Sequence, residues 1–358
     1  MKTCFLAYNI MPTSTGDYFI ALSNKLSKTH KVFVVAGKIR DNRIQLNDDI
    51  TVLKWPSQRP TSLNDFWFLI KLVRLHKPDI MISMFGFVNF FLIVGWLCRV
   101  NVRVAWIRTL STQFGYKKYK VFRKSFIYRL ATNIITNSKA TKQDVNSFFK
   151  IPLSKITVLS NSVVNYSTQL KGIETNFNNL LYVGRLHPEK GVDVLIKAFS
   201  ELTNKFPDLQ LDIIGGGDTL RALQDLGHSL GISDKVSFLG EKDKASVLHA
   251  YKKSYCTIIP SRSEAFGFTV IEAMSTGTCV VGANNTGIKE IIVPGDTGLL
   301  FETGNFEDLA NKLEKLIEDL KYRNKLANAG YSRFLELYEN NYAIGRDTTF
   351  FNKLLESN

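Results

Sequence analysis

Glutamate is absent from the first 170 residues of this 358-residue chain. That segment carries 25 lysines and arginines against seven aspartates, a formal charge of 25 − 7 = +18, whereas residues 171–358 carry 21 against 25, or 21 − 25 = −4. A charge excess confined to one half is typical of a protein whose partner has the opposite charge. We therefore expect the first half to bind an anionic partner: nucleic acid, anionic lipid headgroups or an acidic substrate.

Cysteine is scarce, and long apolar runs are missing. The four cysteines are far apart and form neither a C-x-x-C pair nor a metal-ligand cluster with the five histidines, which favours a reduced cytosolic compartment.

The most apolar run, Met84 to Cys98, is shorter than the roughly 20 residues of a membrane-spanning helix. We predict a buried strand end and helix there, with shallow membrane contact as the alternative. The opening "MKTCFLAYNI" lacks an extended apolar region and a cleavage site, so we expect a core strand and no export.

The composition, 45% apolar and 22% charged, is that of a folded globular protein, and the length predicts two domains of about 170 residues. Strand-like segments alternate with helix-like ones, which predicts parallel sheets with helices on both faces. The polar stretch 169–179 is the expected linker, giving domains 1–170 and 171–339. Two doubly wound domains facing a central cleft would bind ligands beyond the carboxyl ends of their strands. The expected strands are 2–8, 31–36, 50–54, 79–84, 102–107, 133–137 and 156–160, then 179–186, 209–217, 235–240, 256–261, 279–284 and 298–301.

The segment 116–130, "YKKYKVFRKSFIYRL", combines basic residues with one apolar helical stripe. Such a helix suits the surface of an anionic membrane. The alternative of equal weight is a helix that packs its stripe on the core and exposes a basic back. Interleaved aromatic and basic residues can also bind single-stranded nucleic acid. The stripe consists of Tyr119, Phe122, Phe126, Ile127 and Leu130.

Two strand ends carry the residue types of a phosphate site. After "NLLYV" comes "GRLHPEKG", in which Gly184, Arg185 and Lys190 lead into a helix, and "GGGD" with Gly215 follows the next strand. Cations beside a helix N-terminus suit a diphosphate, because the guanidinium forks onto phosphate oxygens and the helix dipole adds positive potential. Solvated cations and tight-turn glycines are the plain structural alternative.

The stretch 261–281, "SRSEAFGFTVIEAMSTGTCVV", places two glutamates around an apolar helix. Gly267 permits close backbone approach, and Gly277 ends the helix. If residues 264–272 were wholly helical, Glu264 and Glu272 would be about 8 × 1.5 = 12 Å apart. That is too far for one pair of carboxyls acting on one glycosidic bond. The spacing instead suits an elongated ligand such as a sugar nucleotide.

These motifs, "EAFGFTVIE" preceded by "GRLHPEKG", resemble those of the retaining GT-B glycosyltransferases, in particular the large bacterial family 4. The resemblance is dense over residues 175–335 and covers the first half only in outline. It implies that Glu264 contacts the transferred hexose near the reacting carbon, that Glu272 hydrogen-bonds the ribose, and that Arg185 and Lys190 clamp the diphosphate. These three, Glu264, Arg185 and Lys190, are the expected catalytic residues. The remaining donor-binding positions that we expect are Gly16, Gly184, Gly215, Phe238, Leu239, Phe266, Gly267, Phe268 and Thr269.

The sequence also departs from the family pattern at several positions. The first loop offers only Gly16, where members often have a glycine pair, and Arg108 stands where many have a histidine. His187 is interpreted as a loop residue. In "NNTGIKEIIVPGDTGLL" (284–300) the glycines are interpreted as turns and Glu290 as a weak helix-start candidate. Since D-x-D is absent and Asp48 and Asp49 are adjacent, we expect no metal, with cations stabilising the charge that grows on the leaving phosphate.

The resemblance implies the function and the fold together. We expect a GT-B protein whose C-terminal helix, about 340–358, crosses back to the N-terminal, acceptor-binding domain. Its activity would be transfer of a hexose from a nucleoside-diphosphate sugar, with retention, to a glycan or lipid-linked acceptor in cell-surface polysaccharide biosynthesis. The protein would lie peripherally on the inner face of the cytoplasmic membrane. The alternatives are a sugar-nucleotide epimerase, another GT-B enzyme such as a phosphorylase, or a nucleic-acid-binding protein; no nucleic-acid partner is expected for the leading hypothesis.

Overall fold

The chain folds into two compact units, as seen in a computed structural model that describes residues 1–40, 44–57, 62–111 and 118–357. The first unit comprises Met1–Ser162 together with Asn340–Asn358, and the second comprises Val163–Glu339. The division falls after Ser162, so the expected boundary after residue 170 is too late. No helix in the described part of the chain has the length and apolar character that crossing a membrane requires.

A seven-stranded parallel sheet forms the centre of the first unit, in the order β3-β2-β1-β4-β5-β6-β7. The order reverses between β1 and β4, as in a doubly wound fold. All seven expected strands are confirmed. They are β1 (Thr3–Ala7), β2 (Lys31–Ala36), β3 (Thr51–Lys54), β4 (Ile80–Met84), β5 (Val102–Ile107), β6 (Asn133–Thr136) and β7 (Ile156–Val158).

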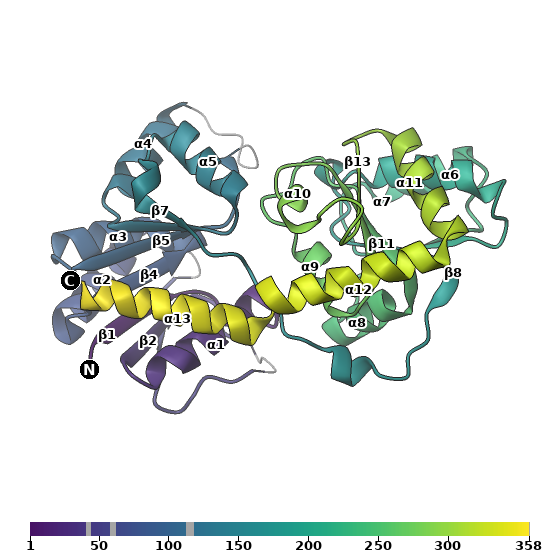
Figure 1. Ribbon diagram of the computed structural model, residues 1–358. Coiled ribbons are helices and arrows are strands. Elements are labelled where there is room, and N and C mark those ends of the chain that lie inside the picture. The colour runs from purple at the N-terminus through teal and green to yellow at the C-terminus, as the bar shows by residue number, and fades with distance from the viewer. Residues whose placement is uncertain (41–43, 58–61, 112–117, 358) are drawn as a thin grey trace. The chain divides into compact units, whose positions relative to one another are not determined.

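Helices cover both faces of this sheet because alternate strand residues point to opposite sides. Leu6 packs with α1 and α13, whereas its neighbour Phe5 packs with α2 and α3. The C-terminal helix α13 therefore belongs to the first unit and lies beside α1 (Figure 1). The helices are α1 (Ser14–Ser27), α2 (Leu63–His76), η1 (Phe85–Phe87), α3 (Val88–Leu97), α4 (Lys118–Arg129), α5 (Lys139–Phe149), η3 (Leu153–Lys155) and α13 (Asn340–Glu356).

The helix α4 does not bury the stripe that its sequence suggests. Ile127 is 7% exposed and packs on the core, but Tyr119, Phe122 and Phe126 are 62%, 77% and 62% exposed. Of the two alternatives for this segment, the core-facing stripe is therefore wrong for these three aromatic residues. Residues 116 and 117 of the expected helix lie outside the described residues.

A six-stranded parallel sheet forms the centre of the second unit, in the order β10-β9-β8-β11-β12-β13. This repeats the order of the first unit, and the reversal now lies between β8 and β11. Because β8 begins at Asn176, where it pairs with Ser254, it takes up part of the expected linker 169–179. The strands are β8 (Asn176–Val183), β9 (Gln210–Ile214), β10 (Val236–Gly240), β11 (Ser254–Ile259), β12 (Cys279–Ala283) and β13 (Leu299–Phe301).

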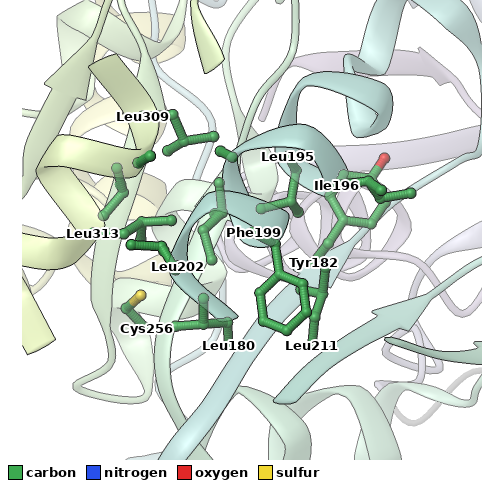
Figure 2. Close-up of a cluster of buried hydrophobic side chains, with 14 of the residues drawn as sticks. Leu180, Tyr182, Leu195, Ile196, Phe199, Leu202, Leu211, Cys256, Leu309 and Leu313 are labelled. Carbon is green, nitrogen blue, oxygen red and sulfur yellow. The ribbon is translucent and has the colours of Figure 1, made fainter. Parts of the chain in front are cut away.

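Two layers of helices enclose the second sheet. Phe199 of α6 and Leu313 of α11 pack over Leu180 and Leu211 on one face (Figure 2), while α8, α9 and α12 cover the other. The helices are η4 (Ser167–Leu170), η5 (Pro188–Lys190), α6 (Val192–Thr203), α7 (Leu220–Ser229), α8 (Lys244–Lys253), α9 (Phe268–Ser275), α10 (Ile288–Ile291), α11 (Phe306–Glu318) and α12 (Leu320–Leu337).

Replacing Phe199 by alanine should destabilise the second unit strongly. Phe199 is fully buried, and truncation of a buried phenylalanine leaves a cavity, so we expect the free energy of unfolding to fall by about 3–5 kcal/mol. The matched control is Phe177→Ala, whose side chain is 54% exposed and should cost less than about 1 kcal/mol. Urea unfolding monitored by circular dichroism measures both variants, and equal midpoints would contradict the packing described.

Candidate functional site

The site lies where the second sheet reverses its strand order. The neighbouring strands β8 and β11 run parallel, but α6 after β8 and α9 after β11 pack on opposite faces. Their connecting loops, 184–191 and 260–267, therefore diverge from adjacent strand ends. Such a switch point is where open parallel sheets bind ligands.

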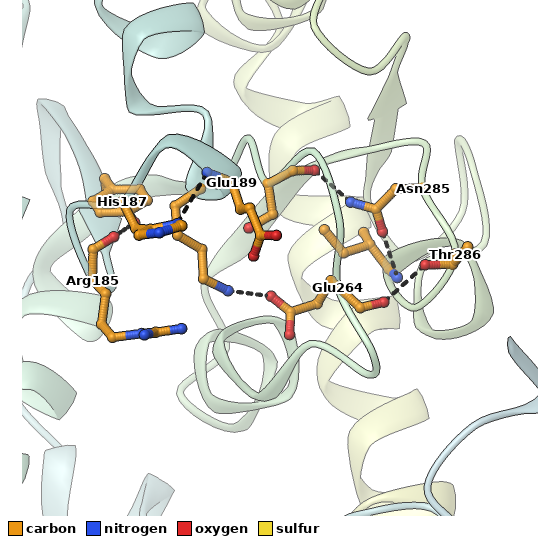
Figure 3. Close-up of polar contacts among 10 residues, drawn as sticks. Arg185, His187, Glu189, Glu264, Asn285 and Thr286 are labelled. Atoms are coloured by element: carbon orange, nitrogen blue, oxygen red, sulfur yellow. Dashed lines mark hydrogen bonds and ion pairs between the residues drawn. The ribbon is translucent and has the colours of Figure 1, made fainter. Parts of the chain in front are cut away.

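An ion pair joins the two loops across the switch point. Lys190 Nζ lies 2.6 Å from Glu264 Oε2, and the two side chains are only 19% and 20% exposed. Figure 3 shows the side chain of Arg185, which lies on the same loop as Lys190, extending toward the Glu264 carboxylate. Three sequence-predicted residues thus come together although Lys190 and Glu264 are 74 positions apart.

The backbones of the two loops are also in direct contact. Arg262 N donates to Glu189 O at 2.8 Å, and the Arg262 guanidinium binds the Asp193 carboxylate with contacts of 2.7 and 2.8 Å. Gly191 has φ 65°, and a Cβ there would lie 2.1 Å from Pro260 O. Glycine is required at this position by both conformation and space, so the ion pair rests on a closely fitted frame.

A third segment, 284–288, supports the Glu264 loop from behind. Thr286 Oγ1 donates to Glu264 O at 2.9 Å (Figure 3). A Cβ on Gly287 would lie 2.5 Å from Glu264 O, 2.7 Å from Phe266 N and 2.8 Å from Phe266 O. Sequence reasoning interpreted the glycines of this stretch as turns, and so it missed this close packing.

Two buried tyrosines link the charged groups. Burial and the negative charge of Glu264 raise the pKa of the Tyr182 phenol, while the positive charge of Arg185 opposes the rise. Burial and the charge of Glu272 likewise raise the pKa of Tyr251, and the nearby Tyr182 phenol also acts to raise it. Both phenols therefore stay protonated and can donate: Tyr182 Oη donates to Arg185 O at 2.9 Å, and Tyr251 Oη to Glu272 Oε2 at 3.4 Å. Neither tyrosine was singled out from the sequence.

Glu272 lies within α9, whereas Glu264 lies before it. The helix begins at Phe268, after Gly267 with φ 112°, so the assumption of continuous helix behind the 12 Å separation is wrong. The Thr269 side chain acts to lower the pKa of the Tyr251 phenol, against the larger effects of burial and of Glu272. Residues Phe266 and Phe268 form an edge-on ring pair, with centroids 5.8 Å apart.

The glycines after β8 and β9 serve close backbone contact. A Cβ on Gly215 would lie 1.9 Å from Gly184 O, and Gly184 N donates to Ile214 O at 3.0 Å. The close approach is therefore to the neighbouring loop. Phe238 packs half-buried on the core and Leu239 is exposed near the end of β10. His187 is exposed, and its Nδ1 accepts from Glu189 N at 3.3 Å.

The remaining sequence-predicted residues have structural partners of their own. Gly16 lies in the first turn of α1, where a Cβ would lie 2.1 Å from Met11 O. Arg108, at the end of β5, is 7% exposed and stacks on Phe19 at 5.3 Å. Burial lowers its pKa to about 10. Glu290 lies in α10, and its backbone oxygen accepts from Arg333 at 3.3 Å.

Over the described ranges, no group of three or more histidine, cysteine, aspartate and glutamate side chains is placed to hold a metal ion. All four cysteines are free thiols, and Cys256 and Cys279 face each other across β11 and β12.

Two family descriptions match consecutive parts of the chain. "Glycosyltransferase Family 4" matches residues 16–164, and "Glycosyl transferases group 1" matches residues 168–333. An uncharacterized glycosyltransferase of Methanocaldococcus jannaschii is 31% identical over 57% of this chain and 56% of its own length. The capsular polysaccharide biosynthesis glycosyltransferase CapM of Staphylococcus aureus is 28% identical over 78% of each chain.

Solved structures share the fold over the full length. The Anabaena protein HepE in complex with UDP superposes with a TM-score of 0.78, at 18% identity over 99% of this chain and 100% of that one. A structure of the same protein with UDP-glucose gives a TM-score of 0.75, at 17% identity over 99% and 100%.

Adding one methyl group at Gly287 should disturb the Glu264 loop. Because the new Cβ would overlap three backbone atoms, we expect Gly287→Ala to lower the free energy of unfolding by about 1–3 kcal/mol. The control Gly227→Ala, in helix α7 with nothing within 4 Å of the added Cβ, should instead stabilise by about 0.5–1 kcal/mol. Urea titration of the two variants measures the contrast, and the same sign for both would contradict it.

Proposed function

Because the chain belongs to the family 4 glycosyltransferases of GT-B fold, we propose that it transfers a hexose-type sugar from a nucleoside-diphosphate sugar to an acceptor hydroxyl. Transfer proceeds with retention at the anomeric carbon and without a metal ion. The observation that carries the proposal is the Lys190–Glu264 pair at the switch point, 2.6 Å long and set beside Arg185.

The donor diphosphate is assigned to Arg185 and Lys190. Cations with fixed positions bind phosphate oxygens by charge-assisted hydrogen bonds. The amides at the start of α9, near Phe268, add the positive end of a helix dipole. UDP and UDP-glucose in the structures of HepE support a nucleotide-sugar donor. Glu272 then receives the ribose hydroxyls, with Tyr251 holding its carboxylate.

The reaction moves one sugar and one proton. The bond between the anomeric carbon and the diphosphate oxygen breaks, the acceptor oxygen bonds that carbon from the same side, and the acceptor proton passes to the leaving phosphate. Negative charge grows on the leaving oxygen, where Lys190 and Arg185 stabilise it most. Glu264 holds Lys190 in place and faces the sugar, whose anomeric carbon gains positive character.

The acceptor is proposed to be a glycan or a lipid-linked saccharide in cell-surface polysaccharide biosynthesis. The similarity to CapM of Staphylococcus aureus supports this process. The positive charge of the first unit supports action at the anionic inner face of the cytoplasmic membrane.

A donor panel tests the proposed activity. The purified chain is incubated with uridine, guanosine and adenosine diphosphate sugars, with and without membrane lipid extract, and each incubation is run with and without a metal chelator. We expect one donor to be consumed faster with the extract, chelator to leave the rate unchanged, and the product to keep the donor's anomeric configuration by NMR. Inversion at the anomeric carbon would contradict the proposed retention. Loss of activity in chelator that Mg²⁺ or Mn²⁺ restores would contradict the proposed metal independence.

Separate substitutions at the two glutamates should separate turnover from donor binding. We expect Glu264→Gln to lower kcat by about 10²–10³-fold while donor Kd is retained. We expect Glu272→Gln to weaken donor binding by about 10–100-fold, through loss of hydrogen bonds to a charged group. Calorimetric titration and initial rates measure both, with exposed Glu201→Gln on α6 as the control. Wild-type behaviour of both site variants would refute the assignments.

A further inference from the structure

A hollow of about 560 Å³ lies at the carboxyl ends of β2 and β3, at the edge of the first sheet. The two strands run parallel with Ala36 beside Lys54, so the segments that follow them leave the sheet as neighbours. Residues 37–40 and 54–57 line this β2–β3 hollow. Its size is that of a site for a small molecule.

The lining of the β2–β3 hollow is positively charged. Its described residues include three cations and no carboxylate. Lys38, Arg40 and Lys54 are exposed, and none of them pairs with a carboxylate in the part of the chain that the structure describes. One buried acid acts from behind Ser57, whose Oγ donates to both oxygens of the Asp65 carboxylate at 2.9 and 2.8 Å. The local formal charge is therefore 3 − 1 = +2.

A buried indole adds an unsatisfied donor to this lining. Trp55 is 1% exposed, and its Nε1 has no hydrogen-bond partner among the described residues. The rings of Phe68, Phe87 and Phe91 surround the indole, with centroids 5.8, 5.6 and 6.0 Å away. Because buried polar groups are nearly always hydrogen-bonded, an orphaned N–H beside three cations points to an acceptor that a ligand supplies.

Backbone hydrogen bonds fix both segments of the lining. Ile10 N donates to Lys38 O and Arg40 N donates to Ile10 O, both at 3.0 Å. Trp55 N donates to Ala36 O at 2.9 Å and so continues the pairing of β2 with β3. The donors of the hollow are therefore held by the sheet before a ligand arrives, which lowers the entropic cost of binding.

A phosphate ester matches this hollow better than other anions do. Its charge at neutral pH is about −1.5 to −2, close to the local charge, and its three terminal oxygens accept from several donors at once. A carboxylate carries only one negative charge. Single-stranded nucleic acid stacks its bases on open aromatic faces, and the enclosed ring of Trp55 offers no such face.

We propose that the β2–β3 hollow binds the phosphate group of a phosphorylated saccharide. Lys38, Arg40 and Lys54 contact the phosphate oxygens, and Trp55 Nε1 donates to one of them. The role of this saccharide as the acceptor rests on the proposed function, whereas its binding does not.

Calorimetric titration of the full chain, with no sugar nucleotide present, tests the binding. The probes are glucose 6-phosphate, glucuronate and glucose. We expect glucose 6-phosphate to bind about tenfold more tightly than glucuronate, and glucose to give no signal. Lys38→Ser/Lys54→Ser should weaken glucose 6-phosphate binding about 10–100-fold. The control Lys25→Ser/Lys28→Ser on α1, with the same change in net charge, should weaken it clearly less.

Two further measurements locate the bound phosphate. Arg185→Ser should retain glucose 6-phosphate binding, because Arg185 is assigned to the donor diphosphate. The chain has four tryptophans, and one indole N–H signal in a nitrogen–proton correlation spectrum should move on saturation with glucose 6-phosphate. Trp55→Phe should remove that same signal. Circular dichroism and thermal unfolding confirm that each variant is folded.

Four outcomes would overturn the proposed site. They are equal losses in the two lysine pairs, an unmoved Trp55 signal, loss of binding in Arg185→Ser, and binding to phosphatidic acid vesicles or a single-stranded oligonucleotide without binding to glucose 6-phosphate.

Transfer assays then test the role of the ligand as acceptor. With the donor that the panel identifies, a phosphorylated saccharide should have a KM about tenfold or more below that of its unphosphorylated form. Lys38→Ser/Lys54→Ser should raise that KM and leave the donor Kd unchanged. Equal KM values for the two saccharides would overturn the acceptor role. Binding without any transfer would refute the proposed function and leave the phosphate site standing.

Discussion

The pairing of β8 with β11 is the constraint on which the site depends. These strands are neighbours in space but not in sequence, and the helices that follow them pack on opposite faces of the sheet. The two loops must therefore diverge above the sheet, and no helix of the described chain packs over their polar groups at this point. Lys190 and Glu264 meet across this gap at 2.6 Å because the strand register brings them there.

The ion pair is held by its surroundings more than by its own attraction. A pair of this exposure gains little net stability, since desolvation offsets much of the Coulombic attraction. What the fold provides is position: Gly191 against Pro260 and Gly287 against Phe266 leave the loops no room to shift. Groups fixed in this way can stabilise developing charge without reorganising when it appears. The buried Tyr182 phenol adds to this effect because it holds the Arg185 carbonyl in place.

The sequence was most informative where one physical signal decided the structure. Short apolar runs bounded by turn residues predicted both sheets, and cations or carboxylates at strand ends predicted the Lys190–Glu264 region. It failed where distant backbone packing decides: Gly287 is needed because residues 264–266 pass beside it, and no local pattern shows that. The α4 pattern has the right period for a helix, but a period does not state which side is covered, so the sequence left open whether Phe122 is exposed or packs on the core.

The two units share one strand order and differ in how they use charge. In the second, acidic and basic groups nearly balance, and hydrogen bonds fix the loops that follow β8 and β11. In the first, the buried acid Asp347 is held by Tyr18 and by Arg346 Nε at 2.7 Å, and Arg108 is buried at 7% exposure. These groups serve the attachment of α13. Most other cations of this unit lie on the surface, where their summed field attracts anions over about 8–10 Å in physiological salt. A long-range field attracts a ligand but selects little for its geometry. A fixed ion pair selects for geometry but acts only at short range. One fold can therefore supply both effects.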